Sequence, residues 1–175
     1  MFKRTLCILL SFTLVACATN VATPVIVAPT KSTDKELMSV NKVTLVDKRS
    51  SPALAIVNGK DMPINKQLVS TLNTWLNDAI GTSPNGSKEM TISLISYASY
   101  VKQESFSFNL ESVIEWQVKL ESKNSTWTKS YQTTMNEEGP LKADNSIIEK
   151  HLNKIAEKLL DRTLSDSEFE RAAFN

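Results

Sequence analysis

The segment from Phe108 to Leu120, FNLESVIEWQVKL, alternates apolar and polar residues along its whole length. The even-numbered positions are almost all apolar, and the odd-numbered positions carry mostly amides and charged groups. Because successive side chains of a strand point to opposite faces, this period predicts a long strand with one covered and one solvated face. Such one-sided cover is typical of an antiparallel sheet.

Further strands are expected on both sides of this segment. Residues 90–97 also alternate, and their apolar positions shift phase near the middle, as a β-bulge would produce. Residues 123–125 predict a hairpin into a strand over 126–135. Two shorter strands are expected at 43–46 and 53–57. The middle of the chain is therefore predicted to be a sheet.

Two amphipathic helices accompany these strands. The first is expected over about 17 residues, with Pro63 in its first turn and Gly81 at its end. The second is expected from Asp144 to Leu160, and Ser165 with Glu168 predicts the capping box of a last short helix. The pattern predicts an α+β fold, with an antiparallel sheet of about four to five strands and two amphipathic helices packed on one face.

Composition excludes several classes of function. The chain has 175 residues, 41% of them hydrophobic, with 20 Lys and Arg against 19 Asp and Glu. A balanced charge does not indicate a nucleic-acid partner. Two cysteines and one histidine cannot form a multi-ligand Cys/His metal site. With four glycines and no phosphate-binding loop, no cofactor is predicted.

The first 16 residues have the layout of a signal peptide. Lys3 and Arg4 precede an apolar run over 6–15, which is too short to span a bilayer. The run ends in L-V-A-C at 14–17, which resembles the lipobox of bacterial lipoproteins. The alternative is an ordinary secreted protein with a free thiol at Cys17.

The lipobox resemblance implies lipid attachment at Cys17. It implies a diacylglycerol thioether on Cys17, cleavage before it, and acylation of the new amino terminus by a chain such as palmitate. Two or more acyl chains give stable anchoring, so the membrane is an expected partner. Ala18 stands where an aspartate would retain the protein in the inner membrane. The expected location is the inner leaflet of the outer membrane, with the domain in the periplasm.

Residues 17–40 are expected to form the lipidated N-terminus and a tether, because they are rich in Thr, Ser, Ala and Pro. Within them, Val25 to Ala28 is a candidate first or edge strand. A single domain is expected over 41–175, and we expect it to fold without the tether.

The whole pattern is similar to the YajG family of small bacterial lipoproteins. The resemblance implies an envelope lipoprotein without an established activity, and it implies no catalytic residue. It rests on the order and spacing of six features: the lipobox, V-I-V-A-P-T at 25–30, Asp47 with Arg49, Ser83 to Gly86, Lys129 to Tyr131, and Asn136 to Gly139.

Few residues suggest chemistry. His151 stands next to Lys150 without a second metal ligand nearby, and we expect it to be a solvated surface residue. Asp47 and Arg49 are expected to form a structural ion pair near a strand end. Glu111 and Glu115, like Glu121, are expected on the solvated face.

The three tryptophans could line a sugar-binding groove. Trp75 and Trp116 lie on apolar stripes and are expected in the core, whereas the position of Trp127 stays open.

Two functions remain. The first is a non-catalytic binding or scaffold role toward an envelope protein or peptidoglycan. The alternative is a cell-wall (peptidoglycan) hydrolase that uses carboxylates such as Glu111, Glu115 or Asp47. Because an enzyme needs ionisable groups that converge in a cleft, the sequence favours the first and predicts no enzyme.

Overall fold

The computed structural model describes residues 25, 27–30, 37 and 39–174. The expected signal peptide at 1–16, Cys17 and most of the expected tether lie outside the described residues.

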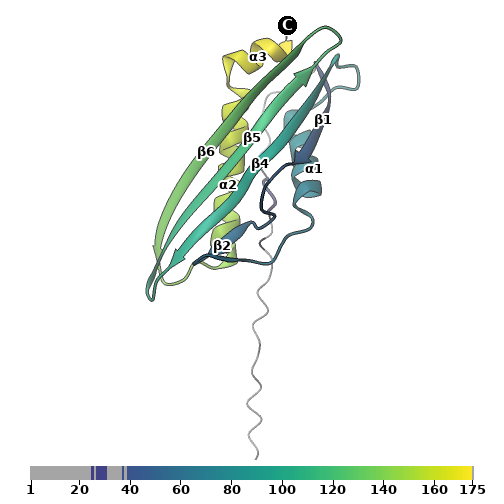
Figure 1. The fold of residues 1–175 in the computed structure, drawn as a ribbon. Helices are drawn as coiled ribbons and strands as arrows, with labels where there is room; N and C mark the ends of the chain where they lie inside the picture. The colour runs from purple at the N-terminus through teal and green to yellow at the C-terminus, as the bar shows by residue number, and fades with distance from the viewer. Residues whose placement is uncertain (1–24, 26, 31–36, 38, 175) are drawn as a thin grey trace, which may run out of the picture.

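The described part of the chain forms an α+β fold around one mixed sheet (Figure 1). The sheet order is β3-β2-β4-β5-β6, and β1 pairs with the first half of β4 on the same side as β2. The six strands are β1 (Val40–Asp47), β2 (Ala55–Val57), β3 (Lys60–Asp61), β4 (Lys88–Gln103), β5 (Ser107–Glu121) and β6 (Thr126–Pro140).

The three long strands form the antiparallel meander that the alternation predicts. β4 pairs with β5 and β5 with β6 over almost their whole lengths. The register of β4 shifts between Leu94 and Ser96, which confirms the predicted bulge. In β5 the even-numbered side chains are buried and the odd-numbered ones are half-buried or exposed. The strand therefore has one covered and one open face.

The expectation of a purely antiparallel sheet is wrong at one side. β1 and β2 both run parallel to β4. The helix that precedes β4 carries the chain back along the sheet, so β4 starts at the same end as β1. A parallel pair needs such a crossover connection, and the expected first helix provides it.

Three helices complete the described fold: α1 (Leu68–Ile80), α2 (Asn145–Leu164) and α3 (Ser167–Phe174). α1 starts later than predicted but ends at Gly81, whose φ of 62° is left-handed, as expected of a C-cap glycine. Asp144 caps α2 by accepting a hydrogen bond from the Ile147 amide. α3 is capped by Asp166 and not by Ser165, because Ser165 already forms the C-cap of α2.

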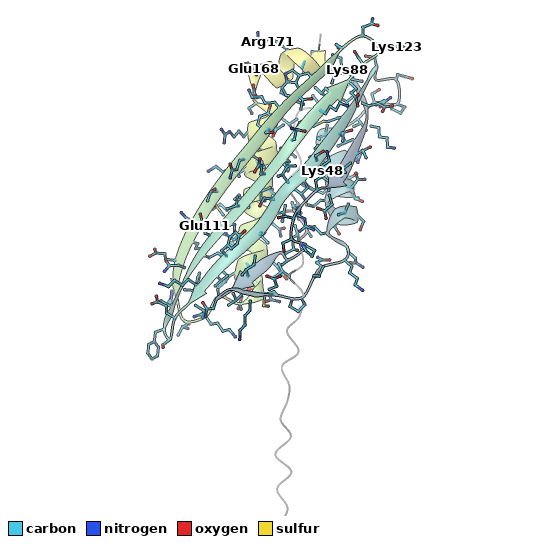
Figure 2. The ribbon with its side chains drawn as sticks, viewed as in Figure 1. Lys48, Lys88, Glu111, Lys123, Glu168 and Arg171 are labelled. Carbon is cyan, nitrogen blue, oxygen red and sulfur yellow. The ribbon has the colours of Figure 1, made fainter. Side chains whose placement is uncertain are left out.

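The helices cover one face of the sheet. α1 contacts β1, and α2 contacts β4, β5 and β6. Both lie behind the sheet in Figure 1, while α3 lies at one end. Lys88 and Arg171 lie at that same end (Figure 2), where the Lys88 ammonium donates hydrogen bonds to the carbonyls of Ala172 and Ala173 in the last turn of α3.

Part of the expected tether belongs to the core. Val25, Val27 and Leu37 are 0%, 0% and 1% exposed. The backbone amide of Ala28 donates to Asn153 Oδ1 of α2 at 3.0 Å. Neither Val25 nor Val27 is in a strand, so the tether and the edge strand are both wrong for these residues. The packed core begins at least sixteen positions before the expected boundary at 41.

Candidate functional site

A chain of buried polar side chains links the sheet to α2. Ser99 Oγ of β4 and Ser112 Oγ of β5 share a hydrogen bond of 2.6 Å, and Ser112 Oγ shares another of 2.6 Å with His151 Nδ1. The His151 Nε2 atom lies 3.8 Å from a carboxylate oxygen of Glu137, which is too long for a hydrogen bond. The two serines are fully buried.

The expectation of a solvated His151 is wrong, because the side chain is 2% exposed. The position of His151 in the helical repeat indicates that its side chain is buried. Residue 151 lies three positions after Ile148 and four before Ile155, so it shares their buried face. A polar residue at that spacing needs a partner from the sheet, and Ser112 supplies it.

The order serine, histidine, carboxylate is that of a nucleophile, its base and an orienting group. Such a set acts only if substrate can reach the nucleophile. Ser99 and Ser112 are both 0% exposed, so neither hydroxyl faces solvent. The arrangement gives both serine hydroxyls and His151 Nδ1 a hydrogen-bond partner inside the core, while His151 Nε2 is buried without one, and it links α2 to the sheet.

Stability should fall as the pH falls below about 6.5, the ordinary pKa of histidine. Burial lowers the pKa of His151, although the nearby Glu137 carboxylate opposes this shift. The unfolded chain therefore takes up a proton that the folded chain excludes, and the stabilisation is lost as the pH falls toward the folded pKa.

This pH dependence can be assigned to His151. The urea midpoint of unfolding should decrease between about pH 7 and pH 5. His151→Gln keeps a hydrogen-bonding group but does not titrate, so its midpoint should be flat in this range. A wild-type slope in that variant would contradict the assignment.

Asp47 and Arg49 form the expected ion pair. Arg49 Nε and Nη2 each donate to one carboxylate oxygen of Asp47 at 2.9 Å. These hydrogen bonds hold the pKa of Asp47 below its ordinary value. The Arg49 side chain is 5% exposed, and Nη1 also donates to the Pro52 carbonyl. The pair fixes the turn after β1, which is a structural role.

The tryptophans do not form a sugar-binding groove. Trp75 and Trp116 are in the core as expected, and Trp116 Nε1 donates to Thr163 Oγ1 at 3.1 Å. Trp127 packs edge-on against Phe169 of α3, with ring centroids 5.8 Å apart. All three therefore pack on the side of the sheet that the helices cover.

Two segments of the YajG resemblance have structural roles. Lys129 and the Tyr131 hydroxyl both bind the Asp166 carboxylate, at 2.7 and 3.0 Å, and so hold the corner between α2 and α3. The hydrogen bond from Lys129 is the main reason that the pKa of Asp166 is lowered to about 2. Gly86 passes over the start of β1, where a Cβ would overlap the backbone of Val40.

No described helix covers the face of the sheet opposite α1 and α2, and we call it the open face. Its β5 positions are partly or fully exposed, and the facing β6 positions are all exposed. Hydroxyl, amide and carboxylate groups dominate it. It comprises, paired across β5 and β6, Asn109 and Glu138, Glu111 and Asn136, Val113 and Thr134, Glu115 and Gln132, Gln117 and Ser130, Lys119 and Thr128, and Glu121 and Thr126.

One end of the open face is hollowed. Tyr100, which is 48% exposed, lies opposite Glu111 and Asn136 in one row across β4, β5 and β6. Figure 2 labels Glu111 in this half of the sheet. The hollow measures about 540 Å³ and is lined by Ile56, Asn58, Gly59, Tyr100, Val101, Lys102, Asn109, Leu110, Glu111, Asn136, Glu137 and Glu138. Glu111 and Asn136 place a carboxylate and an amide beside an exposed aromatic ring.

The described part of the chain offers neither a candidate metal site nor a candidate membrane-spanning helix. It contains no group of three His, Cys, Asp or Glu residues that could hold a metal ion. No described helix is long and apolar enough to cross a membrane. The expected lipid attachment residue, Cys17, lies outside the described residues.

Comparison with known proteins agrees with the YajG resemblance. None of the curated proteins matches the chain. Protein XCC0632 from Xanthomonas campestris has a similar crystal structure, with 14% identity and a TM-score of 0.47 over 80% of this chain and 91% of that one. Lipoprotein GNA1162 from Neisseria meningitidis is 8% identical, with a TM-score of 0.29 over 69% of this chain and 98% of that one. The family model described as "Uncharacterized lipoprotein" matches residues 27–172, so the chain belongs to this family of YajG-like lipoproteins.

Proposed function

We propose that this lipoprotein is anchored through Cys17 in the inner leaflet of the outer membrane. Its periplasmic domain binds peptidoglycan on the open face and does not hydrolyse it. The single observation that carries the binding role is the open face itself. It spans the lengths of β5 and β6, and the described helices pack on the opposite side.

The chemistry of the open face supports a hydrated polymer as the ligand. The buried centre of a stable protein interface is apolar and rich in aromatic residues. The open face instead offers hydroxyls, amides and carboxylates, with Tyr100 at its hollowed end. An exposed ring beside hydrogen-bonding groups suits a sugar, whose apolar and polar surfaces lie close together.

The spacing of the carboxylates supports binding over hydrolysis. Glu111 and Glu115 are four positions apart on one strand, which corresponds to about 13 Å at the usual rise. The two carboxylates of a glycosidase are usually separated by about 5 to 9.5 Å. Asp47 is held by Arg49 at the end of β1 and is paired with neither.

Purified peptidoglycan sacculi test the binding role. The double variant Tyr100→Ala, Glu111→Ala should bind sacculi about tenfold more weakly than the wild type, because it loses the ring and one hydrogen-bonding group. Lys154→Ala with Lys158→Ala, at two exposed positions of α2 and away from the open face, is the control and should bind normally.

Unchanged binding by the Tyr100 and Glu111 variant would overturn the proposed site. A photocrosslinker at position 100 in cells separates the two partner classes. Capture of glycan fragments supports the proposal, whereas a single captured protein would replace peptidoglycan by a protein partner.

A further inference from the structure

We infer that the end of the domain formed by the β4–β5 turn and the β6–α2 connection rests on the lipid bilayer, with Phe106 and Leu141 in contact with the headgroup region. The inference rests on the lipid anchor of the proposed function. It adds an orientation and a lipid-contacting surface to that anchor.

The two most exposed large apolar side chains of the described residues lie side by side at this end. Phe106 is 81% exposed and Leu141 is 70% exposed. The Leu141 amide donates to the Phe106 carbonyl at 2.8 Å, and Gln103 Nε2 donates to the Leu141 carbonyl at 2.8 Å. These bonds tie the two loops together, so both side chains belong to one apolar tip.

Leu141 also adopts an unfavourable backbone conformation. Its φ is 68°, a region that leucine rarely occupies and asparagine occupies more readily. A strained, exposed leucine contributes little to folding, and such strain is concentrated at functional positions. The strain suggests that the apolar side chain is used outside the fold.

The chain joins the folded domain at the same end. Thr30 and Ala28 donate to Glu157 and Asn153 of α2, so tracing the segment backward leads toward the first turn of α2. That first turn directly follows the Leu141 loop. At Val25 the carbonyl accepts a hydrogen bond from Asn65, which follows the exposed Ile64.

The distance to the anchor is short. Cys17 and Val25 are eight positions apart, which permits at most about 28 Å of extended chain. β4 has 16 residues and is about 50 Å long at the usual rise. An anchor shorter than the domain, attached at the end that carries the apolar tip, holds that tip near the membrane.

The contact is apolar and not mainly electrostatic. Lys102 at the tip is paired with Glu104 at 3.3 Å, and the exposed Lys60 neighbours Asp61. With charges of both signs at this end, attraction to anionic headgroups is small. The contact should therefore depend little on salt.

Quenching by brominated lipids tests the orientation. Lipidated full-length protein is reconstituted in vesicles of phosphatidylethanolamine and phosphatidylglycerol with brominated acyl chains. The tryptophan fluorescence that Phe106→Trp adds to that of the three native tryptophans should be blue-shifted and mostly quenched. Asn124→Trp, in the β5–β6 turn beside Lys123 at the opposite end of the sheet (Figure 2), is the matched control and should keep its emission.

A second variant tests the role of Leu141. Added to Phe106→Trp, Leu141→Asn should relieve the backbone strain and raise Tm, yet restore part of the quenched emission because the apolar contact is smaller. Equal quenching at positions 106 and 124, or none at 106, in protein that floats with the vesicles would overturn the orientation and leave the anchor standing. Failure of the wild type to float would refute the anchor itself, and the orientation with it.

Discussion

Val27→Asp should strongly destabilise the protein at neutral pH, although residue 27 lies in the segment that composition assigns to a tether. Val27 is 0% exposed and belongs to the same core cluster as the helices and the sheet. A carboxylate there has no paired cation and must either lose its hydration or take up a proton. We expect a loss of about 4 kcal/mol or more, from a total stability of about 5 to 15 kcal/mol for such a domain.

Urea unfolding followed by circular dichroism measures this loss. Val46→Asp is the control, because Val46 in β1 is 36% exposed and the same chemical change there should cost little. A chain that begins at residue 41 should be destabilised in the same way, because it lacks Val25, Val27 and Leu37. Native-like unfolding of Val27→Asp would show that the segment is not part of the stable core.

Cys17→Ser should move the protein from the membrane fraction to the soluble fraction. The lipobox implies three acyl chains, and one chain of myristoyl length alone gives only marginal, reversible binding. Loss of all three removes nearly all of the membrane affinity, since the apolar tip by itself presents only a few side chains to the bilayer. Detergent phase partition and labelling with a fatty-acid probe measure the outcome.

Cys7→Ser is the matched control for this experiment. Cys7 lies within the expected signal peptide and should be absent from the mature chain. Its replacement should leave labelling and partition unchanged. Labelling that persists in Cys17→Ser would mean that lipid is attached elsewhere and that the lipobox interpretation is wrong.

Local sequence alone determined the parts of the structure whose causes are local. The alternation from Phe108 to Leu120 predicts both faces of β5, because a strand repeats every two residues. Gly81 ends α1 since a left-handed residue is needed there, and Asp47 meets Arg49 two positions away. Each of these features depends on neighbours within a few residues.

Only the tertiary structure decided the features that depend on distant partners. β1 is parallel to β4 because of how α1 crosses between them. The hydrogen-bond partner of His151 Nδ1 is Ser112, 39 positions away. The segment that contains Val25 and Val27 is bound by Asn153 of α2 and by Asn65 before α1, which are far apart in sequence. Phe106 meets Leu141 only when two loops come together. Local periodicity does not encode such pairings, because each depends on which surfaces remain uncovered after the elements have packed.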